Sequence, residues 1–301
     1  MVGINPLGPE WGLLFDRISN KQTFKLTSTD VEGWDINFIL MTVLIFGRAL
    51  RYQFPDRSST LIRGVMCMLW SSVNPFVFIG TKVFWMWIMC SGTLATSWFN
   101  SAANSMLHRG LFKMMMKDFF ETDTFHNSTE SDKDWYLGLT FDAAVKAGFF
   151  GDDNTQGVHP LIERIYNGKT LAYYRNKYLN WVTTDPFKGK DIKEFDTYDT
   201  TVLLKRFFRQ NGSLIQGALD KTAIEGIVMW YMKGENPDAV QQSINIHVAL
   251  RESYFWGREY FDVMLTTLQP YLRQLSASSG QDHTFKATYE DLDEQWRDQF
   301  Y

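Results

Sequence analysis

The sequence predicts an α+β unit followed by an all-helical unit. Three observations support this order: an alternating segment near the start, two strand-like segments on either side of a Gly-Asp-Asp triplet, and helical periods throughout the last third of the chain. The pattern changes near Arg209. We therefore expect a boundary there, with the α+β unit over residues 1–208 and the helical unit over residues 209–301.

The composition is that of a globular chain with a sizeable core, because 45% of its 301 residues are hydrophobic and 21% are charged. It excludes a disordered tail, a coiled coil and a small disulfide scaffold. The two cysteines, Cys67 and Cys90, and the five histidines show no metal-ligand spacing. With a formal net charge of −4, the chain as a whole has no excess of positive charge, so any contact with nucleic acid must come from local basic patches.

No targeting or membrane-spanning segment is predicted. Glu10 and Asp16 come early, and no apolar run follows a basic start, so we expect no signal peptide. The apolar stretches 36–46 and 76–90 are shorter than the roughly 20 residues of a membrane span, and Lys82 interrupts the second. We interpret both stretches as buried elements.

The individual elements follow from the spacing of apolar residues. Thr23–Thr29 alternates, with Phe24 and Leu26 on one face, and predicts a half-buried strand that ends at Asp30. Gly and Asp tolerate the backbone of a hairpin turn, so we expect strands on both sides of the Gly-Asp-Asp triplet. Further along the chain we expect strands over 143–150, 155–158 and 200–208, a hairpin turn at 211–212, a polar loop over 126–134, a turn-rich connection over 183–190, and helices over 36–50, 95–112 with an extension to 120, 160–178, 221–232, 239–255, 259–272 and 289–300.

Two pairs of carboxylates stand at the predicted strand ends. Asp30 and Asp35 flank the turn after the first strand, and Asp152 and Asp153 cap the predicted hairpin. Hard cations take oxygen ligands, and two metal ions about 4 Å apart need bridging acids, so these carboxylates are suited to a two-magnesium site. Solvated caps at strand ends are the alternative for either pair alone.

A segment of small residues lies between these acidic pairs. Ser91 and Gly92 are followed after three residues by Thr96, and after three more by Asn100. At helical spacing Thr96 and Asn100 share a face, and Gly92 allows a bend at the helix start. A small-residue helix packed on a strand is the alternative for this segment alone.

In this order and spacing, the segments resemble the motifs of RNA-dependent RNA polymerases from picorna-like positive-strand RNA viruses. Asp30-Val-Glu-Gly-Trp-Asp35 is similar to the first palm motif of that family, Ser91–Asn100 to the second and Phe150–Asp153 to the third. Thr184–Lys188 is similar to the fourth, which ends in lysine, and Leu203–Phe208 to the fifth. Five motifs in the correct order make the resemblance specific, and it covers essentially the whole chain.

The resemblance implies a right-hand polymerase fold. The palm, an antiparallel sheet with packed helices of the ferredoxin or RRM type, is expected over residues 1–208, with an inserted fingers segment near 52–90. A helical thumb is expected over residues 209–301. Family members also carry upstream fingers with basic motifs that bind the incoming triphosphate. We therefore expect this chain to be the palm and thumb portion of a longer polyprotein product.

The resemblance also implies roles for single residues. Asp30 and Asp152, with Asp153 as the weaker ligand, are expected to hold two Mg²⁺ ions, for which Mn²⁺ is the alternative. Lys188 is expected to protonate the departing pyrophosphate, with Lys190 as the alternative donor. A pair of solvated lysines in a turn, without a catalytic role, is the other alternative. The residues expected to bind the nucleotide are Asp35, Ser91, Gly92, Thr96 and Asn100. The residues expected to bind the RNA and the primer are Lys205, Arg206 and Arg209. For these three, the alternative is a charged hairpin edge that prevents aggregation.

The implied function is template-directed RNA synthesis, in which a primer 3′-hydroxyl attacks the α-phosphate of a ribonucleoside triphosphate and releases pyrophosphate. The implied partners are an RNA template and primer, ribonucleoside triphosphates, a protein primer and other viral replication proteins. The implied location is the host cytoplasm, at membrane-associated replication complexes. Two rivals stay open: a catalytically silent RNA-binding palm and thumb, because the upstream fingers are missing, and a nucleotide cyclase, which has no need to recognise a ribose 2′-hydroxyl.

Overall fold

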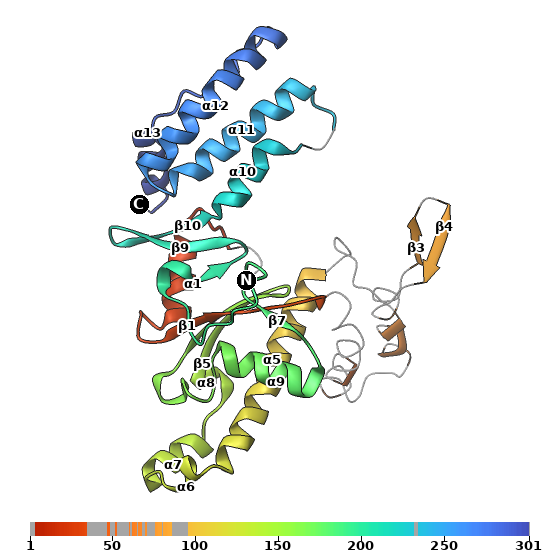
Figure 1. Cartoon of the computed structure of the whole chain (residues 1–301), viewed down its shortest axis with the longest axis vertical. Helices are drawn as coiled ribbons and strands as arrows, with labels where there is room; N and C mark the ends of the chain where they lie inside the picture. The colour runs from red at the N-terminus through yellow and green to blue at the C-terminus, as the bar shows by residue number, and fades with distance from the viewer. Residues whose placement is uncertain are drawn as a thin grey trace. The chain divides into compact units, whose positions relative to one another are not determined.

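The computed structural model describes residues 4–34, 76–79, 81–85, 96–231 and 234–300, with isolated positions between 47 and 70 (Figure 1). The chain forms two compact units, the first containing residues 18–196 and the second residues 3–17 and 197–301. The boundary expected near Arg209 lies inside the second unit, because Arg209 is within a strand of that unit, Arg206–Asn211, which pairs with Leu214–Leu219. The helix expected over 36–50, and most of the segment near 52–90, lie outside the described residues.

A three-stranded antiparallel sheet of order β1-β6-β5 forms the centre of the first unit. Strand β1 (Lys25–Ser28) pairs with β6 (Asp153–Val158), which forms a hairpin with β5 (Val145–Phe150). The strands predicted on both sides of the Gly-Asp-Asp triplet are thereby confirmed. Strand β2 (Asp30–Val31) then leaves this sheet and pairs with β7 (Thr183–Thr184).

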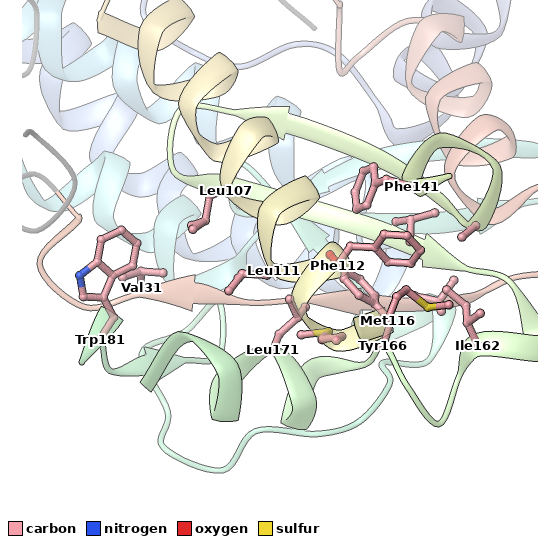
Figure 2. Packing of buried hydrophobic residues seen from close by; sticks show 14 of the residues in the cluster. Val31, Leu107, Leu111, Phe112, Met116, Phe141, Ile162, Tyr166, Leu171 and Trp181 are labelled. Carbon is pink, nitrogen blue, oxygen red and sulfur yellow. The ribbon is translucent and has the colours of Figure 1, made fainter. Parts of the chain in front are cut away.

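One long helix, α5 (Thr96–Phe120), packs against this sheet and against α9 (Gly168–Leu179). The predicted helix over 95–112 and its extension to 120 are confirmed as this single 25-residue element. Figure 2 shows its apolar side chains beside Tyr166 and Leu171. Burial of each large side chain stabilises such a core by about 1.5–3 kcal/mol. The labelled residues that α5 contributes are Leu107, Leu111, Phe112 and Met116.

The polar loop predicted over 126–134 is wrong, because two short helices occupy that region. They are α6 (Asp123–His126) and α7 (Glu130–Leu137). The hydroxyls of Thr122 and Thr129 cap their N-termini by accepting main-chain N–H bonds. Phe125 is buried against the aromatic side chains at the end of α5. One buried side chain and two N-caps are therefore enough to form these helices, without a repeated spacing of apolar residues.

The helix predicted from Pro160 to Tyr178 is also wrong over its first half. A 3₁₀ turn, η1 (Pro160–Ile162), is followed by an irregular stretch, and α9 begins only at Gly168. Asn167 ends that stretch through a capping box with Thr170. The remaining elements of the first unit are the helix α8 (Phe141–Ala144) and the hairpin of β3 (Phe76–Ile79) and β4 (Lys82–Trp85).

The second unit combines a three-stranded sheet of order β10-β9-β8 with helices. The single strand predicted over 200–208 is wrong, because Leu204 and Lys205 take positive φ values of 55° and 57° and divide it. The hairpin turn predicted at 211–212 is confirmed, and the four predicted helices are confirmed with shifted ends. The elements are α1 (Pro9–Ser19), η2 (Tyr198–Thr200), β8 (Val202–Leu203), β9 (Arg206–Asn211), β10 (Leu214–Leu219), α10 (Lys221–Met229), α11 (Asp238–Tyr254), α12 (Arg258–Ser279), α13 (Tyr289–Arg297) and η3 (Asp298–Phe300).

The core of the second unit packs a residue from near the start of the chain against one from its last third. Trp11 on α1 stacks on Phe208 of β9, with ring centroids 4.8 Å apart, and both residues are 2% exposed. Helices α11, α12 and α13 supply most of the remaining apolar cluster. Within the described part of the chain, no helix combines the length and the apolarity that a membrane span requires.

Candidate active site

The two acidic segments meet at one end of the central sheet. Ser28, the last residue of β1, pairs with Thr155 near the start of β6, so Asp30, two residues on, and Asp153, the first residue of β6, lie at the same end of the sheet. A hydrogen bond of 2.7 Å from Asn154 Nδ2 to the main-chain oxygen of Thr29 continues the contact beyond the last ladder pair. Asp152 follows in the hairpin turn. The structure thus places the three predicted metal ligands at the same end of the sheet.

The turn that carries Asp152 is two residues long, because Phe150 pairs directly with Asp153. Its first residue, Gly151, has a φ of 63°, a value that glycine adopts without strain. Helix α5 holds this turn through Ser101, whose Oγ accepts from Gly151 N at 2.8 Å. Asn104 adds a 2.7 Å bond from its Nδ2 to the main-chain oxygen of Asp152. The position of the turn is therefore tied to the helix that follows the second motif.

Lys188 reaches this acidic end and forms an ion pair with Asp30 through Nζ and Oδ2. The Asp30 side chain is 7% exposed, whereas that of Lys188 is 65% exposed. Burial lowers the pKa of Lys188, but the hydrogen bond to Asp30 and the charges of Asp30, Asp152 and Asp153 outweigh it, so the pKa is raised. The ammonium group is therefore charged at neutral pH and lies within the field of all three carboxylates.

A tight turn fixes the backbone of Lys188, whose φ is 66°. The Asp185 carboxylate accepts from the main-chain N–H groups of Phe187 and Gly189 at 2.8 Å and 2.7 Å. Lys190 is exposed, and its side chain forms no hydrogen bond or ion pair with the described residues. The geometry therefore brings Lys188, rather than Lys190, to the acidic site.

The predicted nucleotide-binding residues are placed only in part. Asp35, Ser91 and Gly92 lie outside the described residues. Thr96 begins α5, although only its backbone is described, and Asn100 lies one turn later with 7% exposure. Asn100 is one helical turn before Asn104, so both lie on the α5 face that meets the Gly-Asp-Asp turn.

The three predicted RNA-binding residues differ in their surroundings within the second unit. Arg206 donates to both carboxylate oxygens of Glu252, at 2.9 Å and 2.7 Å, and this pair is largely buried. Arg209 donates to the main-chain oxygen of Phe255 at 3.0 Å. Lys205 is exposed, and its side chain has no ion pair within the parts of the chain that the structure describes. Among these three residues, Lys205 alone presents a cation that the described part of the chain does not engage.

The donor chemistry at the acidic end suits divalent cations. Within the described residues, no group of three or more His, Cys, Asp or Glu side chains is arranged to hold a metal ion. Asp30, Asp152 and Asp153 nevertheless offer hard oxygen donors, the ligands that Mg²⁺ prefers. The Lys188 ammonium on Asp30 shows that this buried carboxylate attracts a cation. The donor atoms present are thus of the kind that divalent cations prefer.

The fold defines the class of protein. It is similar to the Sicinivirus 3Dpol RNA dependent RNA polymerase with a TM-score of 0.68 and 17% sequence identity, and the match covers 99% of this chain and 55% of that chain. This likeness identifies the right-hand polymerase fold, as the sequence predicts. The family model for viral RNA-dependent RNA polymerase matches residues 1–272. The chain therefore belongs to the viral RNA-dependent RNA polymerase family.

The curated relatives are polyproteins of picorna-like viruses. The chain is 31% identical over 140 residues to the genome polyprotein of Rice tungro spherical virus (strain Vt6), covering 45% of this chain and 4% of that protein. It is 23% identical over 310 residues to the RNA1 polyprotein of Beet ringspot virus, covering 94% of this chain and 12% of that protein. The chain thus spans a small fraction of the length of these relatives.

Proposed function

We propose that this chain carries the catalytic centre for template-directed RNA synthesis. In the proposed reaction a primer 3′-hydroxyl attacks the α-phosphate of a ribonucleoside triphosphate, and pyrophosphate leaves. The observation that carries the proposal is the meeting of Asp30, Asp152 and Asp153 at one sheet end, with Lys188 bound to Asp30. Phosphoryl transfer depends mainly on positioning and on neutralising charge, and this arrangement is suited to both tasks.

Asp30 and Asp152 are the proposed principal ligands of two Mg²⁺ ions, with Asp153 as the weaker ligand and Mn²⁺ as an alternative ion. Bound ions of this kind lower the pKa of the attacking hydroxyl and neutralise the triphosphate. The chain's own contribution is to hold the ligands in place. The pairing of β2 with β7 holds Asp30 opposite Thr184, and the α5 contacts to the Gly151 turn orient Asp152.

Lys188 is the proposed general acid for the pyrophosphate leaving group. Its raised pKa keeps a proton on Nζ at neutral pH, and its exposed side chain leaves it free to exchange Asp30 for a phosphate oxygen. Proton donation of this kind contributes about 10²–10⁴-fold to a rate. Lys190 does not reach the carboxylates and is the natural control.

Recognition of the ribose is proposed for Asp35, Ser91 and Asn100, with Gly92 and Thr96 in support. A 2′-hydroxyl both donates and accepts hydrogen bonds, and so do the hydroxyl of Ser91 and the amide of Asn100, so each can bind it in either direction. The burial of Asn100 on the α5 face beside the Gly-Asp-Asp turn supports a fixed orientation of that amide.

Contact with the RNA backbone is proposed mainly for Lys205, because the protein itself engages the guanidinium groups of Arg206 and Arg209. Phosphate contacts of this type position a strand without recognising its sequence. The proposed partners are an RNA template and primer, ribonucleoside triphosphates, a protein primer and other viral replication proteins. The proposed location is the host cytoplasm, at membrane-associated replication complexes.

The test is Mg²⁺-dependent extension of a primed RNA template by this chain and by a version extended upstream in its reading frame. Whether this chain or the extended version is the active one, Asp152→Ala should abolish its incorporation of ribonucleotides. Asp134→Ala, which removes an exposed carboxylate from α7, should leave incorporation unchanged. An extended wild type that binds the template but incorporates nothing would contradict the proposal and would favour the silent RNA-binding alternative.

A further inference from the structure

Six polar side chains form a closed ring of hydrogen bonds inside the first unit, beside the acidic strand end. They come from the link between β1 and β2, from α5, from β6, and from α9 with the stretch before it. Each is between 0% and 4% exposed. They are Thr29, His108, Asn154, Gln156, Tyr166 and Arg175.

Donation runs outward from Arg175 in both directions and ends at Thr29, because a guanidinium can only donate. Arg175 Nη1 donates to Thr29 Oγ1 at 3.0 Å, and Nη2 lies 2.8 Å from His108 Nε2, so that nitrogen must accept. The imidazole is then neutral, with its proton on Nδ1, and this atom lies 2.8 Å from Tyr166 Oη and 3.0 Å from the amide nitrogen of Gln156. Burial, followed by the charge of Arg175, holds the pKa of His108 well below its usual value, in agreement with a neutral ring.

From Tyr166 the hydrogen bonds return to the acidic segments. The Tyr166 hydroxyl donates to Gln156 Oε1 at 2.5 Å, and Gln156 Nε2 donates to Asn154 Oδ1 at 2.7 Å. Asn154 Nδ2 then donates to the main-chain oxygen of Thr29 at 2.7 Å. That oxygen belongs to the peptide group that leads into Asp30, and Asn154 directly follows the two aspartates of the hairpin. Both acidic segments are therefore attached to one ring.

Arg175 is an unusual member of this ring because it is a fully buried cation. Within the described residues it forms no ion pair, and its Nε–H has no hydrogen-bond partner. Burying a charge without an ion pair is unfavourable, so its retention calls for a compensating charge. Burial lowers the pKa of Arg175 to about 10, while Tyr166 and the negative charge of Asp30 act in the opposite direction.

We propose that the ring is a positioning device for nucleotide addition, in which Arg175, His108, Tyr166 and Gln156 act through Thr29 and Asn154 on the two acidic segments. These residues do not touch the substrates, so they are positioning residues. The inference rests on the proposed polymerase function. A displacement of about 1 Å at reacting groups lowers a rate by about 10²-fold, so a break in the ring should slow chemistry more than binding.

The test compares Tyr166→Phe with Tyr174→Phe in the polymerase form that extends primers. Each variant loses one hydroxyl that bonds to α5, but the Tyr174 hydroxyl donates to Asp118 at 2.7 Å, outside the ring. Tyr166→Phe should lower kcat for nucleotide addition by about 10- to 100-fold. Its KM for the triphosphate and its RNA affinity should change by less than about twofold. Tyr174→Phe should keep the wild-type kcat.

A second pair of variants guards against loss of folding. Arg175→Lys keeps the charge but removes the two-pronged donor, and Arg164→Lys makes the same change at an exposed position. Thermal unfolding of all four variants separates a lower kcat from a lower stability. Arg175→Lys should lower kcat while Arg164→Lys should not.

Amide hydrogen exchange gives a readout that does not need activity. Tyr166→Phe should speed exchange at residues 29–31 and 151–154, and Tyr174→Phe should not. If Tyr166→Phe matches Tyr174→Phe in both kcat and exchange, the positioning role is overturned. A wild-type enzyme that extends no primer would instead overturn the proposed function, and the exchange comparison would still decide whether the ring holds the acidic segments.

Discussion

Removal of the Arg206 guanidinium should destabilise the second unit. Arg206 donates to both oxygens of Glu252 and also to the main-chain oxygen of Gly217 at 2.7 Å. The two charged side chains are 14% and 10% exposed. Breaking a buried ion pair by removing one partner costs about 3–5 kcal/mol, because the other charge stays buried alone. Since this pair retains some contact with solvent, we expect Arg206→Ala to cost about 3 kcal/mol.

The assay is urea denaturation followed by tryptophan fluorescence. The double variant Arg206→Met with Glu252→Leu should recover most of the loss, because it removes both charges together. Lys205→Ala is the matched control from the same turn: its stability should stay within about 0.5 kcal/mol of wild type. This control should weaken RNA binding and reduce the salt slope by about 1.

The opposite pattern would refute this reasoning. If Arg206→Ala keeps the wild-type urea midpoint but reduces the salt dependence of RNA binding, the guanidinium contacts a phosphate rather than Glu252. The role expected for Arg206 from the sequence would then hold, and the ion pair would be dispensable.

Three further outcomes are expected. Lys188→Ala should slow primer extension by about 10²-fold or more, while Lys190→Ala keeps the wild-type rate in the same gel assay. Gly151→Ala places a side chain on a backbone with positive φ, so it should cost about 1–2 kcal/mol of stability in urea titrations and slow primer extension. Gly212→Ala, at the same φ of 63°, should cost similar stability and leave primer extension unchanged. Burial raises the pKa of Asp196 to about 6. Because the fold disfavours its charged form, stability should fall by up to about 3 kcal/mol as pH rises from about 4 to 6, and Asp196→Asn should abolish that fall in thermal scans.

The sequence was sufficient to predict the acidic hairpin, because its signal is local. A glycine followed by two aspartates between strand-like segments specifies a turn, and Gly151 does take the positive φ that such a turn uses. The order of five motifs then predicted the polymerase family. The two acidic segments come together through the register of β1 and β6, which a single sequence does not reveal.

The contacts made by Lys188 and Arg206 could not be predicted from spacing. Lys188 meets Asp30 across 158 residues, and Arg206 meets Glu252 across 46. The spacing of the histidines indicates no metal site, but a different signal was present, since Asn100, Asn104 and His108 recur every four residues on one face of α5. A polar stripe on the buried face of a long helix indicates a buried network, although it does not identify the partners.

The errors in secondary structure have a common physical cause. The region 126–134 looked like a loop because its composition is polar, yet threonine caps and the single anchor Phe125 are enough to form short helices. The strand over 200–208 looked continuous because its residues are apolar, but Leu204 and Lys205 adopt a left-handed backbone. Caps and turns act on single residues, so hydrophobic periods do not reveal them.

The packing of α1 against β9 has a consequence for how the chain is made and divided. Trp11 lies near the start of the chain, while its stacking partner Phe208 emerges from the ribosome only after the whole first unit. Contacts with such a long sequence separation form late, so completion of the second unit must wait for sequence from both ends. A fragment of residues 197–301 alone would lack the indole that covers Phe208. Expression trials on the second unit should therefore join residues 3–17 to it through a linker.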